Sequence, residues 1–313
     1  MRPTHIVRRR ARLEALTTED DRVRKTLATV EFREPVRLRP GLIRRPTPLD
    51  GSDISDRHPP PASDGAPLRR LVRPRGVAIQ LELLLLAWAQ GPARRPEELP
   101  PADDAQAEHD LVELIALPAV ASVDGAQATQ PADKRLRSLQ SALDHLADES
   151  LVLMKKTGRD RFLGPIDLLH EEDDQGGRVR ARRYALPGAL DPTVDLPVSF
   201  FTQGWHYCLD PSEILVYLMI RDICSRGGHH ITAEDRLTTY VLNKDALLRT
   251  KLLEAAGLLE VTRDPRQRPD GTVEGFGDRS GKPRLQRWAL LDEGLERPAR
   301  VALEQALENL ESA

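Results

Sequence analysis

Histidine and cysteine side chains gather in one stretch of the sequence, where they could bind a metal ion. The candidates are His206, Cys208, Cys224, His229 and His230. Structural zinc sites use cysteine pairs about two to four residues apart, and the two cysteines here are too widely separated to form one. Cys224 shares a helical face with Tyr217 and Ile220, which favours a small buried side chain over a ligand. We therefore expect no metal.

Motifs that carry catalysis or cofactor binding are absent from the sequence. It has no Gly-x4-Gly-Lys-Ser/Thr loop, no Gly-x-Gly-x2-Gly after a strand, no Gly-x-Ser-x-Gly and no His-Glu-x2-His. The acidic run HEEDDQGG at 170–177 is typical of a solvated linker between domains. We expect a protein that is not an enzyme, with no cofactor and no small-molecule ligand.

Charge is high but nearly balanced: 46 lysines and arginines face 49 aspartates and glutamates, for a formal net charge of -3. Such a balance gives no overall basic field to attract nucleic acid. Basic residues nevertheless exceed acidic ones in residues 1–46, and acidic residues gather in 292–313. Contacts with nucleic acid would have to come from local basic clusters.

Cysteine content and hydropathy indicate the cytoplasm. Two cysteines imply no disulfide framework, and the charged N-terminus lacks the apolar segment of a secretory signal. The longest apolar run, LELLLLAWA at 81–89, is shorter than the roughly 20 residues that span a bilayer. We expect a cytoplasmic protein without a membrane span.

The first 70 residues have little apolar periodicity, and RHPPPASDGAP at 57–67 is rich in residues that favour loops. This composition predicts a basic, largely disordered arm with one short helix near residues 17–29. Within the arm, Arg8, Arg9, Arg10 and Arg12 could follow the minor groove of DNA. An unstructured soluble tail explains them equally well.

Ordered structure is predicted from about residue 76, in two units with the same element order. In the first unit, helices are expected at 77–91, 107–117 and 129–150, then two strands joined by a turn at Thr157–Gly158. In the second, Asp210, Thr232 and Asn243 precede three further helices, and strands follow at 258–264 and 285–291. Gly257 stands where a left-handed residue ends the third helix.

This order of three helices, strand, basic hairpin and strand resembles the winged helix-turn-helix superfamily, present twice in tandem. The run FFTQGWHYCLDPSEILVYLMI at 200–220 is similar to bacterial, actinobacterial-like regulators and plasmid replication initiators. The resemblance implies a mainly α fold with small β-hairpins (α+β), a disordered N-terminal arm and a C-terminal helix. Its predicted segments are the arm (1–70), a first winged-helix domain (71–172), a linker (173–204), a second winged-helix domain (205–292) and an acidic helix (293–313).

The resemblance also implies double-stranded DNA as the partner, with the third helices in the major groove and the wings on phosphates. Helical spacing of about 100° per residue places leucines on one side of each third helix, among them Leu248, and polar side chains on the other. The predicted contacts are Arg137, Gln140, Ser141, Lys155, Lys156, Arg159, Lys244, Thr250, Lys251, Arg263, Arg266, Arg268, Lys282 and Arg284. A solvated polar face explains them as well, and Glu254 on the same arc opposes a phosphate.

Two functions remain open at this point. The first is regulation of transcription or initiation of replication of a mobile element by sequence-specific DNA binding. The second is a protein-interaction subunit with the same fold and no sequence-specific DNA binding. The tandem winged-helix accessory subunits of bacterial condensins, which bind protein partners, are of this kind. The apolar side of the C-terminal helix predicts either packing on the domain or a homodimer contact.

Overall fold

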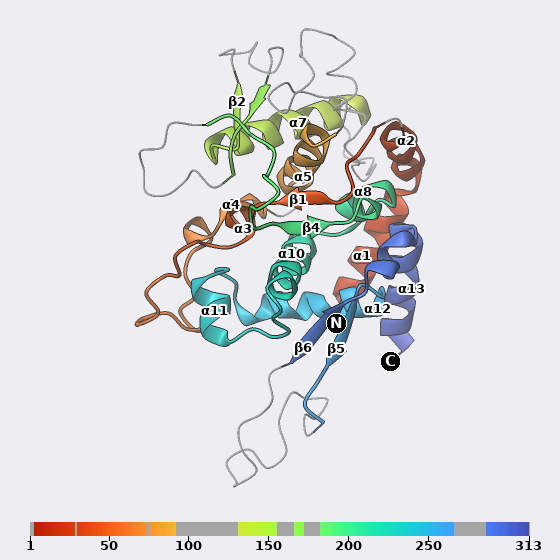
Figure 1. The fold of residues 1–313 in the computed structure, drawn as a ribbon. Coiled ribbons are helices and arrows are strands. Elements are labelled where there is room, and N and C mark those ends of the chain that lie inside the picture. Colours follow the sequence, from red (N-terminus) through yellow and green to blue (C-terminus); the bar gives the residue numbers. More distant parts are fainter. Residues whose placement is uncertain are drawn as a thin grey trace, which may run out of the picture.

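Helices dominate the architecture and surround a core that draws on both halves of the chain (Figure 1). This computed structural model describes residues 3–28, 30–73, 76–91, 131–154, 166–171, 182–265 and 286–312. Within these ranges the strands form small antiparallel pairs. The expected fold class, mainly α with small β elements, is therefore confirmed at that coarse level.

The described residues form α-helices, 3-10 helices and short strands. The α-helices are α1 (Pro3–Ala15), α2 (Thr17–Leu27), α3 (Pro40–Ile43), α4 (Pro67–Leu71), α5 (Ala78–Ala89), α7 (Pro131–Asp148), α8 (Ser199–Thr202), α9 (Trp205–Cys208), α10 (Pro211–Ser225), α11 (Ala233–Thr238), α12 (Thr250–Ala255) and α13 (Ala299–Ser312). The 3-10 helices are η1 (Ala62–Asp64), η3 (Lys244–Arg249) and η4 (Asp292–Glu296). The strands are β1 (Val36–Leu38), β2 (Val152–Met154), β3 (Ile166–Leu168), β4 (Val194–Leu196), β5 (Leu259–Thr262) and β6 (Arg287–Leu290).

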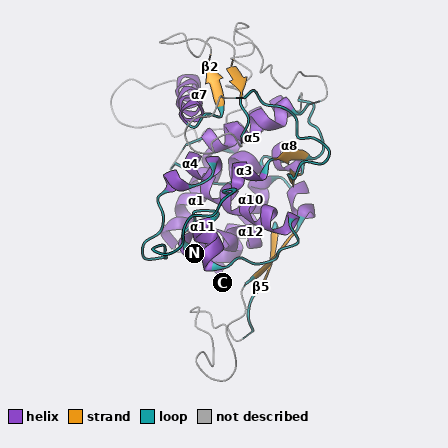
Figure 2. Cartoon of the chain, turned by 60° about the vertical axis from the view of Figure 1, so that its left-hand side comes forward, coloured by secondary structure: helices purple, strands orange, loops and turns teal. Residues whose placement is uncertain are grey.

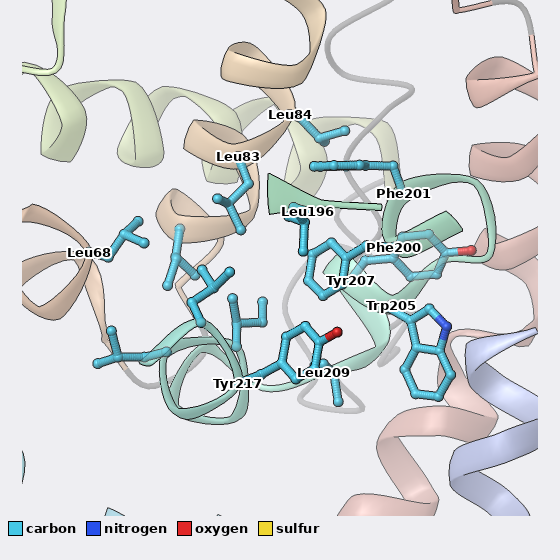
Figure 3. Close-up of a cluster of buried hydrophobic side chains, with 14 of the residues drawn as sticks. Leu68, Leu83, Leu84, Leu196, Phe200, Phe201, Trp205, Tyr207, Leu209 and Tyr217 are labelled. Atoms are coloured by element: carbon cyan, nitrogen blue, oxygen red, sulfur yellow. The ribbon is translucent and has the colours of Figure 1, made fainter. Parts of the chain in front are cut away.

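The centre of the core is built from α5 and from the aromatic run that precedes α10. Every residue of α5 is buried, as its continuous apolar sequence predicts. Figure 3 shows Leu83 and Leu84 of this helix in one cluster with Phe200, Phe201 and Tyr217. The rings of Phe200 and Tyr217 stack with centroids 5.8 Å apart. None of the described helices has both the length and the apolar character needed to cross a bilayer.

Strands β1 and β4 join distant parts of the chain in the middle of the molecule. Val36 pairs with Leu196 and Leu38 with Val194, and all four side chains are fully buried. Figure 1 shows this pair between α5 and α10. Residues 36–38, predicted to belong to a disordered arm, are thus part of the core.

Order in the N-terminal segment corrects the prediction of a largely disordered arm. The short helix expected near residues 17–29 is present as α2, but α1 was not expected. Ile6, Leu13 and Leu16 are buried, and Arg9 occupies the same helical stripe. Apolar periodicity does not register a stripe that contains a charge, because the pattern counts only apolar residues.

Arg9, Arg10 and Arg12 of α1 are engaged within the protein, whereas Arg8 is exposed. Three such contacts are inconsistent with a free arm in the minor groove. Arg9 donates to Glu213 at 2.8 Å, and both side chains are almost completely buried. Arg12 contacts Asp210, and Arg10 pairs with Glu311 at 2.8 Å near the surface. Burial of a charge is tolerated only when it is paired, so the Arg9–Glu213 pair fixes α1 on the N-terminus of α10.

The segment that leads into the predicted proline-rich linker is also held in place. The backbone amides of Arg45 and Leu49 donate to the carbonyls of Thr239 and Thr238, each at 3.0 Å. Asp56 accepts two hydrogen bonds from the Arg236 guanidinium, at 2.8 and 2.9 Å. These contacts attach residues 45–56 to the segment that contains α11.

Helix α13 packs on the domain, which is one of the two outcomes predicted for it. Ala302, Leu303, Ala306 and Leu307 are buried within the chain, where the helix lies against α1 and α12. Since these residues are already covered, they offer no apolar seam to a second copy. A homodimer stays a prediction.

Candidate nucleic-acid interface

The first helix of the second predicted unit, α10, supports the elements that could meet a duplex. Its N-terminus is a capping box in which the Asp210 side chain accepts from the Glu213 amide, and the Glu213 carboxylate accepts from the Asp210 amide at 2.8 Å. Pro211 occupies the first turn, where its missing N–H costs nothing. After the helix, Gly227 has a φ of 75°, a left-handed conformation that favours glycine.

The second and third helices are also capped as the sequence predicts. The Thr232 hydroxyl accepts from the Asp235 amide at 2.9 Å and begins α11. The Asn243 side chain accepts from the Ala246 amide at 3.1 Å and begins η3, which continues into α12. Gly257 ends α12 with a φ of 77°.

The third helix begins as a 3-10 helix, and this changes which side chains face outward. Thr250, predicted as a DNA contact, is buried, and its hydroxyl donates to the Leu247 carbonyl at 2.7 Å. Leu248, predicted to lie in the core, is 59% exposed. A 3-10 helix has about three residues per turn, so each residue advances about 120° where the prediction assumed about 100°. Over the length of η3 this difference in rotation per residue is large enough to exchange the inner and outer positions.

The outer edge of η3 and α12 is a ridge made of Asp245, Leu248 and Lys251, all exposed. Side chains three residues apart lie above one another in a 3-10 helix, which explains the alignment. Lys244 is exposed beside the ridge, and its backbone amide donates to Asp56 at 3.0 Å. Two of the predicted cations, Lys244 and Lys251, thus face solvent.

The β5–β6 hairpin lies directly against this helix. Leu259 pairs with Leu290 and Thr262 with Arg287, and the amide of Trp288 donates to the carbonyl of His229 in the α10–α11 loop at 2.7 Å. Trp288 itself is buried. The hairpin is therefore fixed to both the first and the third helix of the unit.

An ion pair between helix and hairpin alters the charge of the surface. Arg263 donates to both carboxylate oxygens of Glu254, one of them at 2.9 Å. The hydrogen bond to Glu254 raises the pKa of Arg263 above its ordinary value, so the guanidinium stays charged. Glu254, which as a lone charge would repel a phosphate, is neutralised. Arg263 was predicted as a phosphate contact, but its guanidinium is paired with Glu254.

Helix α7 presents the other predicted face. Leu139, Leu143 and Leu146 are buried as expected, while Arg137 and Ser141 are exposed and Gln140 is half-buried. The Arg137 guanidinium donates to the Asp133 carbonyl at 3.2 Å. The polar face of α7 is present, and whether it meets DNA stays a prediction.

Seven predicted contacts lie outside the described residues. They are Lys155, Lys156, Arg159, Arg266, Arg268, Lys282 and Arg284. The strands that flank these segments are formed as predicted, β2 with β3 and β5 with β6. The expected helix at 107–117 also lies outside the described residues.

The two candidate faces lie at opposite ends of the molecule. We name the part formed by η3, α12, β5 and β6 the hairpin end, and the part formed by α7, β2 and β3 the α7 end. Figure 1 and Figure 2 both place the α7 end at the top and the hairpin end at the bottom. The faces therefore do not form one continuous surface.

The residues considered for metal binding are not arranged for it. Burial lowers the pKa of His206 to about 3, and its ring packs against Phe201 and Tyr207. Burial raises the pKa of the Cys208 thiol to about 12, which disfavours the thiolate that a metal requires. Among the described residues no three His, Cys, Asp or Glu side chains converge on one point.

No protein-family model, no curated protein and no solved structure matches this chain. The candidate interface therefore rests on its own geometry. The residue that sequence reasoning missed is Leu248, since the sequence carries no signal that separates a 3-10 start from an α-helical one.

Proposed function

We propose that the protein binds double-stranded DNA through its hairpin end, with η3 and α12 in the major groove and the hairpin along the phosphates. The observation that carries the proposal is the exposed ridge of the third helix beside a hairpin fixed by the Trp288–His229 backbone bond. An α-helix fits the major groove, and a hairpin that extends from β5 and β6 next to it would lie over the adjacent backbone.

Charge supports the same surface. The Glu254–Arg263 pair removes one acidic charge from it, and Lys244 and Lys251 remain exposed. Apart from the paired Arg263, the sequence between β5 and β6 adds Arg266, Arg268, Arg279, Lys282 and Arg284 against Asp264, Asp270, Glu274 and Asp278. This local excess of positive charge exists although the whole chain carries a formal net charge of -3.

Because the two candidate faces are at opposite ends, one straight duplex would meet one end at a time. We assign the groove contact to the hairpin end, where the described elements include all three helices and the paired strands of the hairpin. Transcription regulation and replication initiation both fit such a contact. A chromatin-immunoprecipitation map from the native host would distinguish scattered promoters from one origin.

The proposal is tested by titrating the protein into a labelled random-sequence duplex at increasing salt and following fluorescence anisotropy. We expect the association constant to fall steeply with salt, with a logarithmic slope of several units. The double variant Lys244→Ala/Lys251→Ala should lower that slope by about 2, since each lost phosphate contact removes about 0.9.

The matched control is Lys25→Ala, because Lys25 is exposed on α2, outside the hairpin end. Its slope should equal that of the unsubstituted protein. Arg137→Ala tests the α7 end in the same assay and should also leave the slope unchanged. Absence of binding at low salt, as expected of a protein-interaction subunit, would refute the proposal, and so would a double variant that binds like the control.

A further inference from the structure

Leu248 is the one large apolar side chain that the described part of the third helix exposes. Leu252 and Leu253 on the following turn are buried, whereas Leu248 is 59% exposed between Asp245 and Lys251. Single exposed leucines are common on protein surfaces and need no function. The place of this one, at the middle of the ridge proposed to enter the groove, is what distinguishes it.

Hydrogen bonds hold the backbone of the ridge, so that the backbone of Leu248 has a defined position. The Asn243 cap fixes the start of η3, the Lys244 amide bonds to Asp56, and the Thr250 hydroxyl closes the last turn on the Leu247 carbonyl. A backbone that is already ordered loses little conformational freedom on binding, which favours the use of this segment in recognition.

The charge next to Leu248 indicates what it would face. Asp245 stands three residues before it on the same ridge, and a carboxylate beside a phosphate is repulsive. A carboxylate can instead accept a hydrogen bond from the N4 amino group of cytosine. The part of the ridge formed by Asp245 and Leu248 is therefore better suited to base edges than to the sugar-phosphate backbone, whereas Lys251 is suited to a phosphate.

We propose that Leu248 is a specificity-determining residue that contacts the C5-methyl group of a thymine in the major groove. The thymine methyl is the apolar group that base pairs present there, and apolar side chains are its complement. The inference rests on the proposed DNA binding and adds the chemical feature that is read.

The test begins with selection of a preferred duplex from a random pool by the unsubstituted protein. Each thymine of that duplex is then replaced by uracil, which removes only the methyl group and keeps every hydrogen-bonding atom. We expect one replacement to weaken binding about fourfold, the factor that corresponds to burying one methyl group. Leu248→Ala should bind the thymine and uracil duplexes equally.

Two variants serve as controls. Leu153→Ala removes another exposed leucine, 49% exposed on β2 at the α7 end, and should retain the fourfold difference. Lys251→Ala should retain it too while lowering the salt slope, because it removes a charge and leaves the apolar contact. Circular dichroism establishes that each variant is folded.

The outcomes separate this inference from the proposed function. If no duplex binds, both are refuted. If the protein selects a sequence but uracil replacement has no effect at any position, or if Leu248→Ala still discriminates thymine from uracil, the thymine contact is refuted while DNA binding stands. If Leu248→Ala binds the duplex selected by the unsubstituted protein as tightly as that protein does, Leu248 has no role in the groove. That result is expected if Leu248 contacts a protein partner.

Discussion

Glu82 offers the sharpest test of how the core is held together. This carboxyl group lies in the middle of α5 with no exposed surface, and neither of its oxygens has a hydrogen-bond partner among the described residues. Burial, followed by repulsion from Glu171, raises the pKa of Glu82 well above 4.5. The nearby Glu171 already pairs with Arg39 at 2.8 Å, so that arginine serves a different carboxylate.

The sign of the effect on stability follows from this shift. In the unfolded chain the carboxyl ionises near pH 4.5, whereas in the folded protein it keeps its proton to much higher pH. The contribution of Glu82 to the unfolding free energy is therefore fully present below its unfolded pKa. It is lost as pH rises through its folded pKa. Between the two values each pH unit costs about 1.4 kcal/mol of unfolding free energy.

The substitution Glu82→Gln keeps the shape of the side chain and removes its titration. We expect it to be more stable than the unsubstituted protein near pH 8, and the difference should shrink as pH falls toward 5. Urea unfolding followed by circular dichroism at several pH values measures this difference. Glu14→Gln, at an exposed position of α1, is the control and should follow the unsubstituted protein. Parallel curves for Glu82→Gln and the unsubstituted protein would show that the buried carboxyl does not keep its proton, and the reasoning would fail.

Two further predictions concern the packing of the second unit. Arg9→Met should lower the unfolding free energy by about 3–5 kcal/mol, because it leaves Glu213 buried without its partner. Arg10→Met breaks an exposed pair and should cost less than about 1 kcal/mol in the same urea titration. Gly257→Ala should cost about 1 kcal/mol, since only a left-handed backbone is strained there. Gly294→Ala should cost clearly more in thermal melts, because its added methyl carbon would lie 2.0 Å from the Gly257 carbonyl oxygen; equal losses at the two glycines would contradict this.

Features encoded by neighbouring residues could be predicted from the sequence. The capping box at Asp210, the cap at Thr232 and the left-handed end at Gly257 each depend on residues within one turn, and all three are present. The burial of α5 follows from its unbroken apolar sequence. The paired strands of the hairpin were likewise predicted.

Features that depend on distant partners could not be predicted. Arg9 is separated from Glu213 by 204 positions, and Asp20 on α2 is buried where it accepts from the Tyr207 hydroxyl. Each charge interrupts the apolar stripe of its helix, so periodicity indicated a disordered arm. Only the folded chain supplies the partners that make these charges tolerable in the interior.

The position of the third helix was predicted, but the exposure of two of its residues was wrong for a different physical reason. The third helix was expected in its observed place, and its lysines are exposed, but the 3-10 start exchanged Leu248 with Thr250 between surface and core. Helical wheels assume one pitch for the whole element, and a few residues of tighter pitch are enough to rotate the later turns of the helix.

The packing of α1 helps to hold the hairpin end in a fixed position. Arg9 joins α1 to the N-terminus of α10, and α10 packs against η3, α12 and β6. Asp56, at the other side, holds both Arg236 and the Lys244 amide. The N-terminal segment thus braces the third helix from two directions without presenting Arg9 to a ligand. Under the proposed function, the N-terminal segment would act on DNA binding through the position of the ridge, and the proposed phosphate contacts lie at the hairpin end.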